Sequence, residues 1–156
     1  MPILSWDIHS VFLREHASKH KLQFDSKALD AFHKKYNWAV NVSELLAKHP
    51  YEALVLTDSK QEIQWVNDGF NKMTGYPTNY AIGRRPNFLQ GKETSLKNIN
   101  SFRENLNKGI PFEETLTNYR KNGEIYICKI TIHPLKDTNN IITHYLALEN
   151  ELKMTG

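Results

Sequence analysis

Cysteine is nearly absent from this chain of 156 residues, which contains only Cys128. A single cysteine excludes an internal disulfide framework and any metal site built from several thiolates, and it is typical of a reducing compartment. The chain also lacks a run of about 18 apolar residues, so the sequence predicts no membrane-spanning helix. The first ten residues, MPILSWDIHS, lack the basic and apolar segments of a secretion signal. We therefore expect a cytoplasmic protein.

Strong charge of one sign is missing as well. The net charge is +3 with histidine neutral, which is too small to favour nucleic acid as a partner. No glycine-rich phosphate loop, nucleophile elbow or metalloprotease motif occurs, so nothing in the sequence indicates an enzyme. Hydrophobic residues make up 40% of the chain and charged residues 24%, which is ordinary for a globular protein of one domain with an extension.

The seven histidines raise the question of a metal site. His16 and His20 stand four residues apart on a predicted helix, with Glu15 beside them, and that spacing can hold a metal ion. A third ligand is not visible, so a solvated helix face is the favoured interpretation. We expect no metal site.

Residues 1–48 predict a helical N-terminal extension. A first helix carries Trp6, Val11, Phe12 and Leu13 among polar neighbours. A second helix starts near Asp25, with apolar residues at the spacing of one helical face, namely Ala28, Leu29, Phe32 and Tyr36. A short third helix lies within NVSELLAKHP and stops before Pro50.

Residues 49–152 predict one α+β domain, with residues 153–156 as a tail. EALVLTD and IQWVN are typical of a strand hairpin, and SLKNINSFRENLNKG predicts an amphipathic helix. Three strands follow, in FEETLTNYR, EIYICKITIHPL and IITHYLALENEL. The dipeptide Asn122-Gly123 predicts a type I′ turn between the first two of these strands. Two groups of strands separated by helices favour a five-stranded antiparallel sheet with helices on one face.

From about Glu52 to Asn150 the chain resembles a PAS domain, which shares this order of elements. The general features are ALVLTD, IQWVNDGFNKMTGY and YRKNGEIYICKITIHPL. Within that family it is most similar to the LOV (light-oxygen-voltage) subgroup of flavin photosensors, through GRRPNFLQG and the segment that follows it. The resemblance implies that Gln90 and Asn118 would contact a flavin ring and that Arg103 would contact its phosphate.

Several positions depart from the LOV pattern. The resemblance places Pro86 where the pattern has the cysteine that bonds to the flavin in light, and Arg85 where it has a neighbouring asparagine. Asn87 stands for a second phosphate-binding arginine, and Cys128 for a second ring-binding asparagine. Glu149 stands for the glutamine that relays the state of the flavin. Because Pro86 has no sulfur, we predict that no adduct forms at this position.

The chemistry of Cys128 and Glu149 can be interpreted from the strands that carry them. Alternation places Cys128 on one face of its strand with Tyr126 and Ile130, where a buried small hydrophobic residue is favoured over a reactive thiol. Glu149 shares a face with Tyr145 and Ala147. If that face borders a pocket, its carboxylate is desolvated and tends to be protonated. The alternative is that Glu149 lies near the strand end, in water.

The opposite face of the last strand predicts a covered surface. Ile142, His144, Leu146 and Leu148 share it, and a row of apolar side chains needs a cover. The N-terminal helices, a second copy of the chain, or both, would supply it. We therefore predict a homodimer whose interface includes the outer sheet face and the N-terminal helices.

Two versions of a sensor function remain open at the level of the sequence. In the first, the domain binds FMN and responds by flavin reduction without adduct formation. In the second, which we favour, the pocket takes another small molecule or is filled by side chains, and the domain is a regulatory interaction module. Bound cofactor is then absent or is weakly held FMN, and the downstream signalling partner is not encoded in a recognisable motif.

Overall fold

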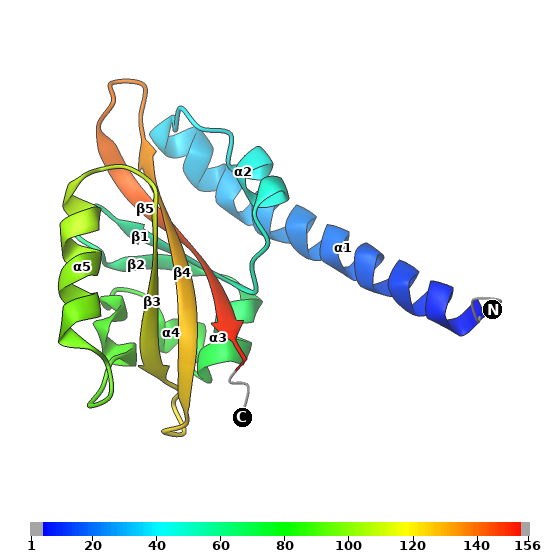
Figure 1. Ribbon diagram of the computed structural model, residues 1–156. Helices are drawn as coiled ribbons and strands as arrows, with labels where there is room; N and C mark the ends of the chain where they lie inside the picture. Colours follow the sequence, from blue (N-terminus) through cyan, green and yellow to red (C-terminus); the bar gives the residue numbers. More distant parts are fainter. Residues whose placement is uncertain (1–4, 154–156) are drawn as a thin grey trace.

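The computed structural model describes residues 5–153, with side chains from residue 8 onward, and shows two strands and then three strands, with helices before the first group and between the two groups (Figure 1). The elements are α1 (Ser5–Tyr36), α2 (Val42–Lys48), β1 (Ala53–Asp58), β2 (Ile63–Val66), α3 (Asp68–Thr74), α4 (Thr78–Ala81), the 3-10 helix η1 (Pro86–Leu89), α5 (Leu96–Asn107), β3 (Phe112–Tyr119), β4 (Ile125–Lys136) and β5 (Ile142–Leu152). The predicted tail residues 154–156 and the side chain of Trp6 lie outside the described part.

The five strands form one antiparallel sheet in the order β2-β1-β5-β4-β3. The last strand, β5, is therefore the centre of the sheet, paired with β1 on one side and with β4 on the other. This arrangement confirms the predicted fold class. Side chains from β1 and β4 therefore lie beside those of β5 on each face of the sheet.

Alternation along the strands produces two separate hydrophobic clusters, one on each face of the sheet. The inner cluster lies beneath α3, α4 and α5, and the outer cluster lies beneath α2 and the C-terminal half of α1. Leu146 and Leu148 belong to the outer cluster as predicted, and His144 is buried with them. Ile142 differs from the prediction, because it lies against the end of α5 near Gly109, beyond a register shift at Leu135/Lys136.

The N-terminal extension differs from the prediction in its number of helices. The two helices expected on either side of Asp25 are one continuous helix, α1, of 32 residues. No glycine or proline interrupts residues 5–36, so nothing in the backbone chemistry forces a break. Asp25 is buried inside the helix, where its carboxylate accepts hydrogen bonds from the Tyr51 hydroxyl at 2.8 Å and the Asn67 amide at 3.2 Å.

Only one half of α1 covers the sheet. Leu29 is fully buried in the outer cluster, with Phe32 and Tyr36 packed against it. The other half extends away from the body (Figure 1) and exposes Phe12 and Leu13. The predicted cover is therefore confirmed for the C-terminal half of α1 and for α2, and it is wrong for the N-terminal half. Because the chain itself buries Leu146 and Leu148, the outer sheet face is not available to a second copy.

The hairpin between β3 and β4 is present, but its turn type differs from the prediction. Gly123 has a φ of +90°, whereas Asn122 keeps a negative φ. The Gly123 N–H donates to the carbonyl of Arg120 at 2.9 Å, and the Asn122 side chain accepts from the Glu124 N–H at 3.0 Å. A turn followed by one left-handed glycine therefore replaces the two-residue type I′ turn, since the asparagine side chain stabilises the turn without entering the left-handed region.

Candidate functional site

A cavity of about 420 Å³ lies between the inner sheet face and the helices η1 and α5. Its volume is in the range of small-molecule sites in proteins. The lining residues are Val55, Thr57, Gln61, Arg85, Pro86, Asn87, Leu89, Gln90, Ile99, Phe102, Arg103, Leu106, Asn107, Leu116, Asn118, Ile130, Ile132, Tyr145, Ala147 and Glu149.

Local sequence patterns explain the apolar walls of this cavity. Alternate residues of β4 and β5 point inward, which brings Ile130, Ile132 and Ala147 to the same side of the sheet. The helix α5 starts at Leu96, where the Ser95 hydroxyl accepts from the Asn98 N–H at 3.3 Å. Successive turns of that helix then place apolar side chains over the sheet. The result is a space with apolar walls and polar groups at its ends.

Seven of the eight residues compared with the LOV pattern line this cavity, and Cys128 does not. Asn118 and Glu149 are buried, whereas Asn87 and Arg103 are exposed. The lining therefore grades from a closed end on β3 and β5 to an open mouth at η1 and α5. Pro86, the first residue of η1, and Gln90, directly after that helix, also belong to the lining. Their roles toward a ligand stay predictions.

Cys128 is fully buried on β4, in the inner cluster. Burial and the neighbouring negative charge of Glu149 raise the pKa of its thiol well above the usual range. The thiol is 3.8 Å from Oε2 of Glu149, and it is the sole cysteine of the chain. The interpretation of Cys128 as a buried small side chain is therefore confirmed, because the thiol neither lines the cavity nor ionises readily.

Glu149 is an acidic side chain in a buried environment. It is 5% exposed and lines the cavity, so the interpretation that placed it in water at the strand end is wrong. Burial raises the pKa of its carboxyl from 4.5 to about 7, although contact with the Cys128 thiol opposes that rise. Within residues 8–153, this thiol is the one side-chain hydrogen-bond partner of the carboxyl group.

Two further polar groups, on Tyr126 and Asn118, lie near the closed end. The Tyr126 hydroxyl is buried and has no hydrogen-bond partner of good geometry among the described residues. Burial raises the pKa of Tyr126, and the side chain of Asn118, the residue paired with it across β3 and β4, opposes that rise by hydrogen bonding. Buried polar groups are nearly always paired in proteins. Asn118 and Glu149 therefore bring unused hydrogen-bonding capacity to one end of the cavity.

Sequence reasoning missed several polar residues of the lining. Thr57, Gln61 and Asn107 all border the cavity. Thr57 could have been predicted from the alternation along β1, which places its side chain on the same face as that of Val55. Gln61 carried no such signal, because it lies in the turn between β1 and β2 with a φ of +68°. Its position depends on that turn rather than on a periodic pattern.

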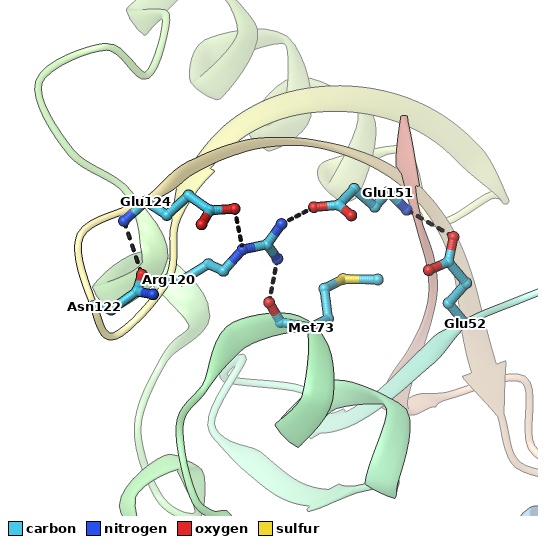
Figure 2. A network of polar contacts seen from close by, with 6 residues as sticks. All are labelled: Glu52, Met73, Arg120, Asn122, Glu124 and Glu151. Carbon is cyan, nitrogen blue, oxygen red and sulfur yellow. Dashed lines mark hydrogen bonds and ion pairs between the residues drawn. The ribbon is translucent and has the colours of Figure 1, made fainter. Parts of the chain in front are cut away.

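An ionic network next to the closed end was also missed (Figure 2). The Arg120 guanidinium pairs with the carboxylates of Glu124 and Glu151 and donates to the carbonyl of Met73. The Glu151 N–H donates in turn to Glu52 at 3.2 Å. This arginine network therefore joins the β3–β4 hairpin, the end of α3 and the end of β5.

The arginine network contacts the closed end of the cavity through one aromatic ring. The Arg120 guanidinium lies over the Tyr126 ring, at 4.4 Å from its centroid. Glu151, which pairs with this arginine, is two residues beyond Glu149 on β5. The network therefore borders the place where β5 ends, immediately after its cavity-lining segment.

The histidine pair on α1 lies on an exposed helix face. The Nε2 atoms of His16 and His20 are 3.0 Å apart on an exposed surface, and the part of the chain with described side chains contains no group of three potential ligands. Among the described helices, none is both long and apolar enough to cross a bilayer.

Comparisons with known proteins agree with the fold. The PAS domain family matches residues 52–152. A blue-light photoreceptor of Listeria innocua is 37% identical over 102 residues, which are 64% of this chain and 40% of that protein. The chain thus spans less than half the length of this relative.

Solved structures of light sensors are similar in shape. One, described as "Flavin Analogue Sheds Light on Light-Oxygen-Voltage Domain Mechanism", has a TM-score of 0.66 and 27% identity over 74% of this chain and 87% of that chain. The light-state dimer of the fungal blue-light photoreceptor Vivid has a TM-score of 0.60 and 26% identity, over 64% of this chain and 76% of that chain.

Proposed function

The chain belongs to the PAS domain family, and from that premise we propose that it is a regulatory sensor and interaction module that binds a small molecule without cysteinyl–flavin chemistry. The observation that carries this proposal is the cavity of about 420 Å³, which has polar groups at both ends and no thiol in its lining. The relatives that are blue-light photoreceptors support a signalling role. The proposed action is binding, not catalysis.

The positions of two residues support the proposal that no flavin adduct forms. Pro86 lines the cavity at the start of η1, and a proline side chain offers no nucleophile. The chain's thiol, on Cys128, is enclosed on β4 and has a raised pKa, and a thiol in that state is a poor nucleophile. The lining therefore contains no cysteine sulfur that could form a bond to a flavin in blue light.

The open cavity favours a small-molecule ligand over the idea that side chains fill the pocket. A flavin remains the alternative ligand, since Gln90, Asn118 and Arg103 all line the cavity. Glu149 argues against a tightly held flavin. Its carboxylate, when ionised, would face a ring edge that carries mostly hydrogen-bond acceptors, and two acceptors repel each other. We therefore expect FMN to be weakly bound or absent in the purified protein.

Dimerisation through α1 is the proposed route of signalling. Residues 1–48 form the extension and residues 49–152 the sensor domain in this proposal. The projecting half of α1 exposes apolar side chains at Ile8, Val11, Phe12 and Leu13. Ile8, Val11 and Phe12 follow the i, i+3, i+4 spacing of one helical face, and an exposed apolar face is typical of an interface. The light-state dimer formed by Vivid supports assembly of such domains in pairs.

An absorption spectrum of the purified protein before and after blue light tests the proposal. We expect no stoichiometric flavin band, and no reversible bleaching when FMN is added in excess. A bleached state that recovers in the dark, together with a flavin-sized mass on Cys128, would show adduct chemistry and overturn the proposal. Stoichiometric flavin without bleaching would favour the alternative, a sensor that responds by flavin reduction.

A further inference from the structure

The closed end of the cavity combines an acceptor that has almost no partner with a buried amide that also lines the cavity. Glu149 on β5 and Asn118 on β3 are 5% and 3% exposed, and both line the cavity. The strand between them, β4, contributes Ile130 to the same lining. A buried carboxyl group whose one contact is a thiol at 3.8 Å is incompletely satisfied, which costs free energy unless a ligand supplies donors.

The chemistry of a carboxylate restricts the ligand that can supply those donors. An ionised carboxylate accepts hydrogen bonds and donates none, and it pairs best with two parallel N–H groups. A ring N–H next to an exocyclic amino group presents this arrangement. The amide of Asn118 both donates and accepts, so it can pair with a neighbouring carbonyl group or ring nitrogen of the same heterocycle.

We propose that this cavity binds a 2-amino-4-oxopyrimidine heterocycle, the ring shared by guanine and pterins, with its N–H and amino groups paired to Glu149 and its polar edge completed by Asn118. This inference rests on the proposed function, because it names the ligand class of the same cavity. Apolar side chains of Ile99, Phe102 and Ile132 provide walls for a flat ring.

The mouth of the cavity adds a preference for an anionic substituent. Arg85 and Arg103 line the cavity and are exposed, whereas Glu149 in the same lining is buried. Arginine binds phosphate and carboxylate groups through paired N–H donors. A nucleotide of guanine, or a pterin with an acidic side chain, would therefore bind more tightly than the uncharged ring.

Ligands of the two chemical classes make opposite demands on the proton of Glu149. Pairing with two donors favours the ionised carboxylate, so this ligand class would bind more weakly as pH falls below about 7, where the carboxyl is protonated. A flavin edge needs the protonated form and would bind more weakly above that pH. The ionisable groups around the carboxyl are Cys128 and Tyr126 from β4, Glu52 before β1 and Glu151 on β5.

Calorimetric titration of the full chain with matched ligand pairs tests this inference. Guanosine is compared with inosine, which lacks the amino group, and pterin is compared with lumazine, which replaces that group by a carbonyl. We expect at least one aminated ligand to bind 10-fold or more tightly than its control, since hydrogen bonds to a charged group contribute about 1.5–3 kcal/mol. The pair that discriminates identifies the source of the ring.

Substitution of Glu149 separates this recognition from nonspecific stacking in the cavity. In Glu149→Gln the preference for the aminated ligand should fall to within about 3-fold, and FMN affinity should rise. Glu104→Gln, on the exposed side of α5, is the matched control and should keep the wild-type preference. Guanosine monophosphate should bind more tightly than guanosine in the wild type, and Arg103→Ala should remove that difference.

Three outcomes would overturn the inference. They are equal affinity for both members of each pair, a preference retained in Glu149→Gln, and wild-type affinity for FMN that exceeds affinity for every aminated ring. None of them overturns the proposed function, which fails on the formation of a blue-light adduct.

Discussion

The two faces of the sheet use the same strands for different purposes. On the outer face, the buried side chains of the strands are the apolar Leu54, Leu56, Leu135, Leu146 and Leu148 with His144, closed over by α1 and α2. On the inner face, a cavity of about 420 Å³ remains, with buried Asn118 and Glu149 in its lining. Residues that alternate along one strand therefore stabilise the fold on one side and leave unsatisfied polar capacity on the other.

Truncation of a core leucine to alanine should give the largest difference in unfolding free energy between the two faces. Leu146→Ala removes a fully buried side chain from the outer cluster and should lower the free energy of unfolding by about 2–5 kcal/mol. Leu116→Ala on the inner face should cost less, because Leu116 already borders open space and has fewer neighbours to lose. Denaturant unfolding of both variants measures the difference. Equal losses would mean that the inner face is packed as tightly as the outer one.

Glu149→Gln should stabilise the ligand-free protein at neutral and higher pH. The pKa of Glu149 is raised from 4.5 to about 7 in the folded state, so wild-type stability falls as pH rises between these values. The variant lacks this loss, so above pH 7 its free energy of unfolding should exceed that of the wild type by at most about 3 kcal/mol. Unfolding measured at pH 5 and pH 8 checks it. A difference that does not grow with pH would contradict the assignment.

The two halves of α1 offer a related comparison between covered and uncovered surface. Phe12 is 60% exposed on the projecting half, so Phe12→Glu should weaken self-association while changing the free energy of unfolding by less than about 0.5 kcal/mol. Lys19→Glu, an exposed charge change on the same helix, is the control. Light scattering over a range of concentrations measures association. A wild-type protein that is monomeric at high concentration would reject the proposed dimer.

His144 should give the outer face the opposite pH response, with a smaller effect. Burial is the main cause that lowers the pKa of His144, so the folded state disfavours its protonated form. Stability is then lost as pH falls below the ordinary value of 6.5. His144→Phe, which keeps an aromatic ring beside Tyr36 and Trp38, should reduce this acid sensitivity. Exposed His9→Asn should leave the pH profile unchanged, and a profile unaltered by His144→Phe would contradict the explanation.

Much of the fold was predictable, because its signals are local. The alternation of Tyr126, Cys128 and Ile130 correctly indicated one buried strand face, and Gly75 ends α3 with the left-handed φ expected of a helix terminus. The extent of α1 was not predictable in the same way. A second helix was expected to start near Asp25, but Asp25 lies within α1, where its contacts with Tyr51 and Asn67 bury it.

The sequence by itself determined the two faces of each strand, the α+β order of elements and membership of the PAS family, since all three depend on patterns that span a few residues at a time. Only the tertiary structure decided what the side chains on those faces meet. It placed β5 between β1 and β4, which buried Glu149 beside Cys128 and raised the pKa of its carboxyl. It also joined Arg120 to Glu151, 31 residues further along the chain. Such contacts arise from the order of strands in the sheet, which local periodicity does not encode.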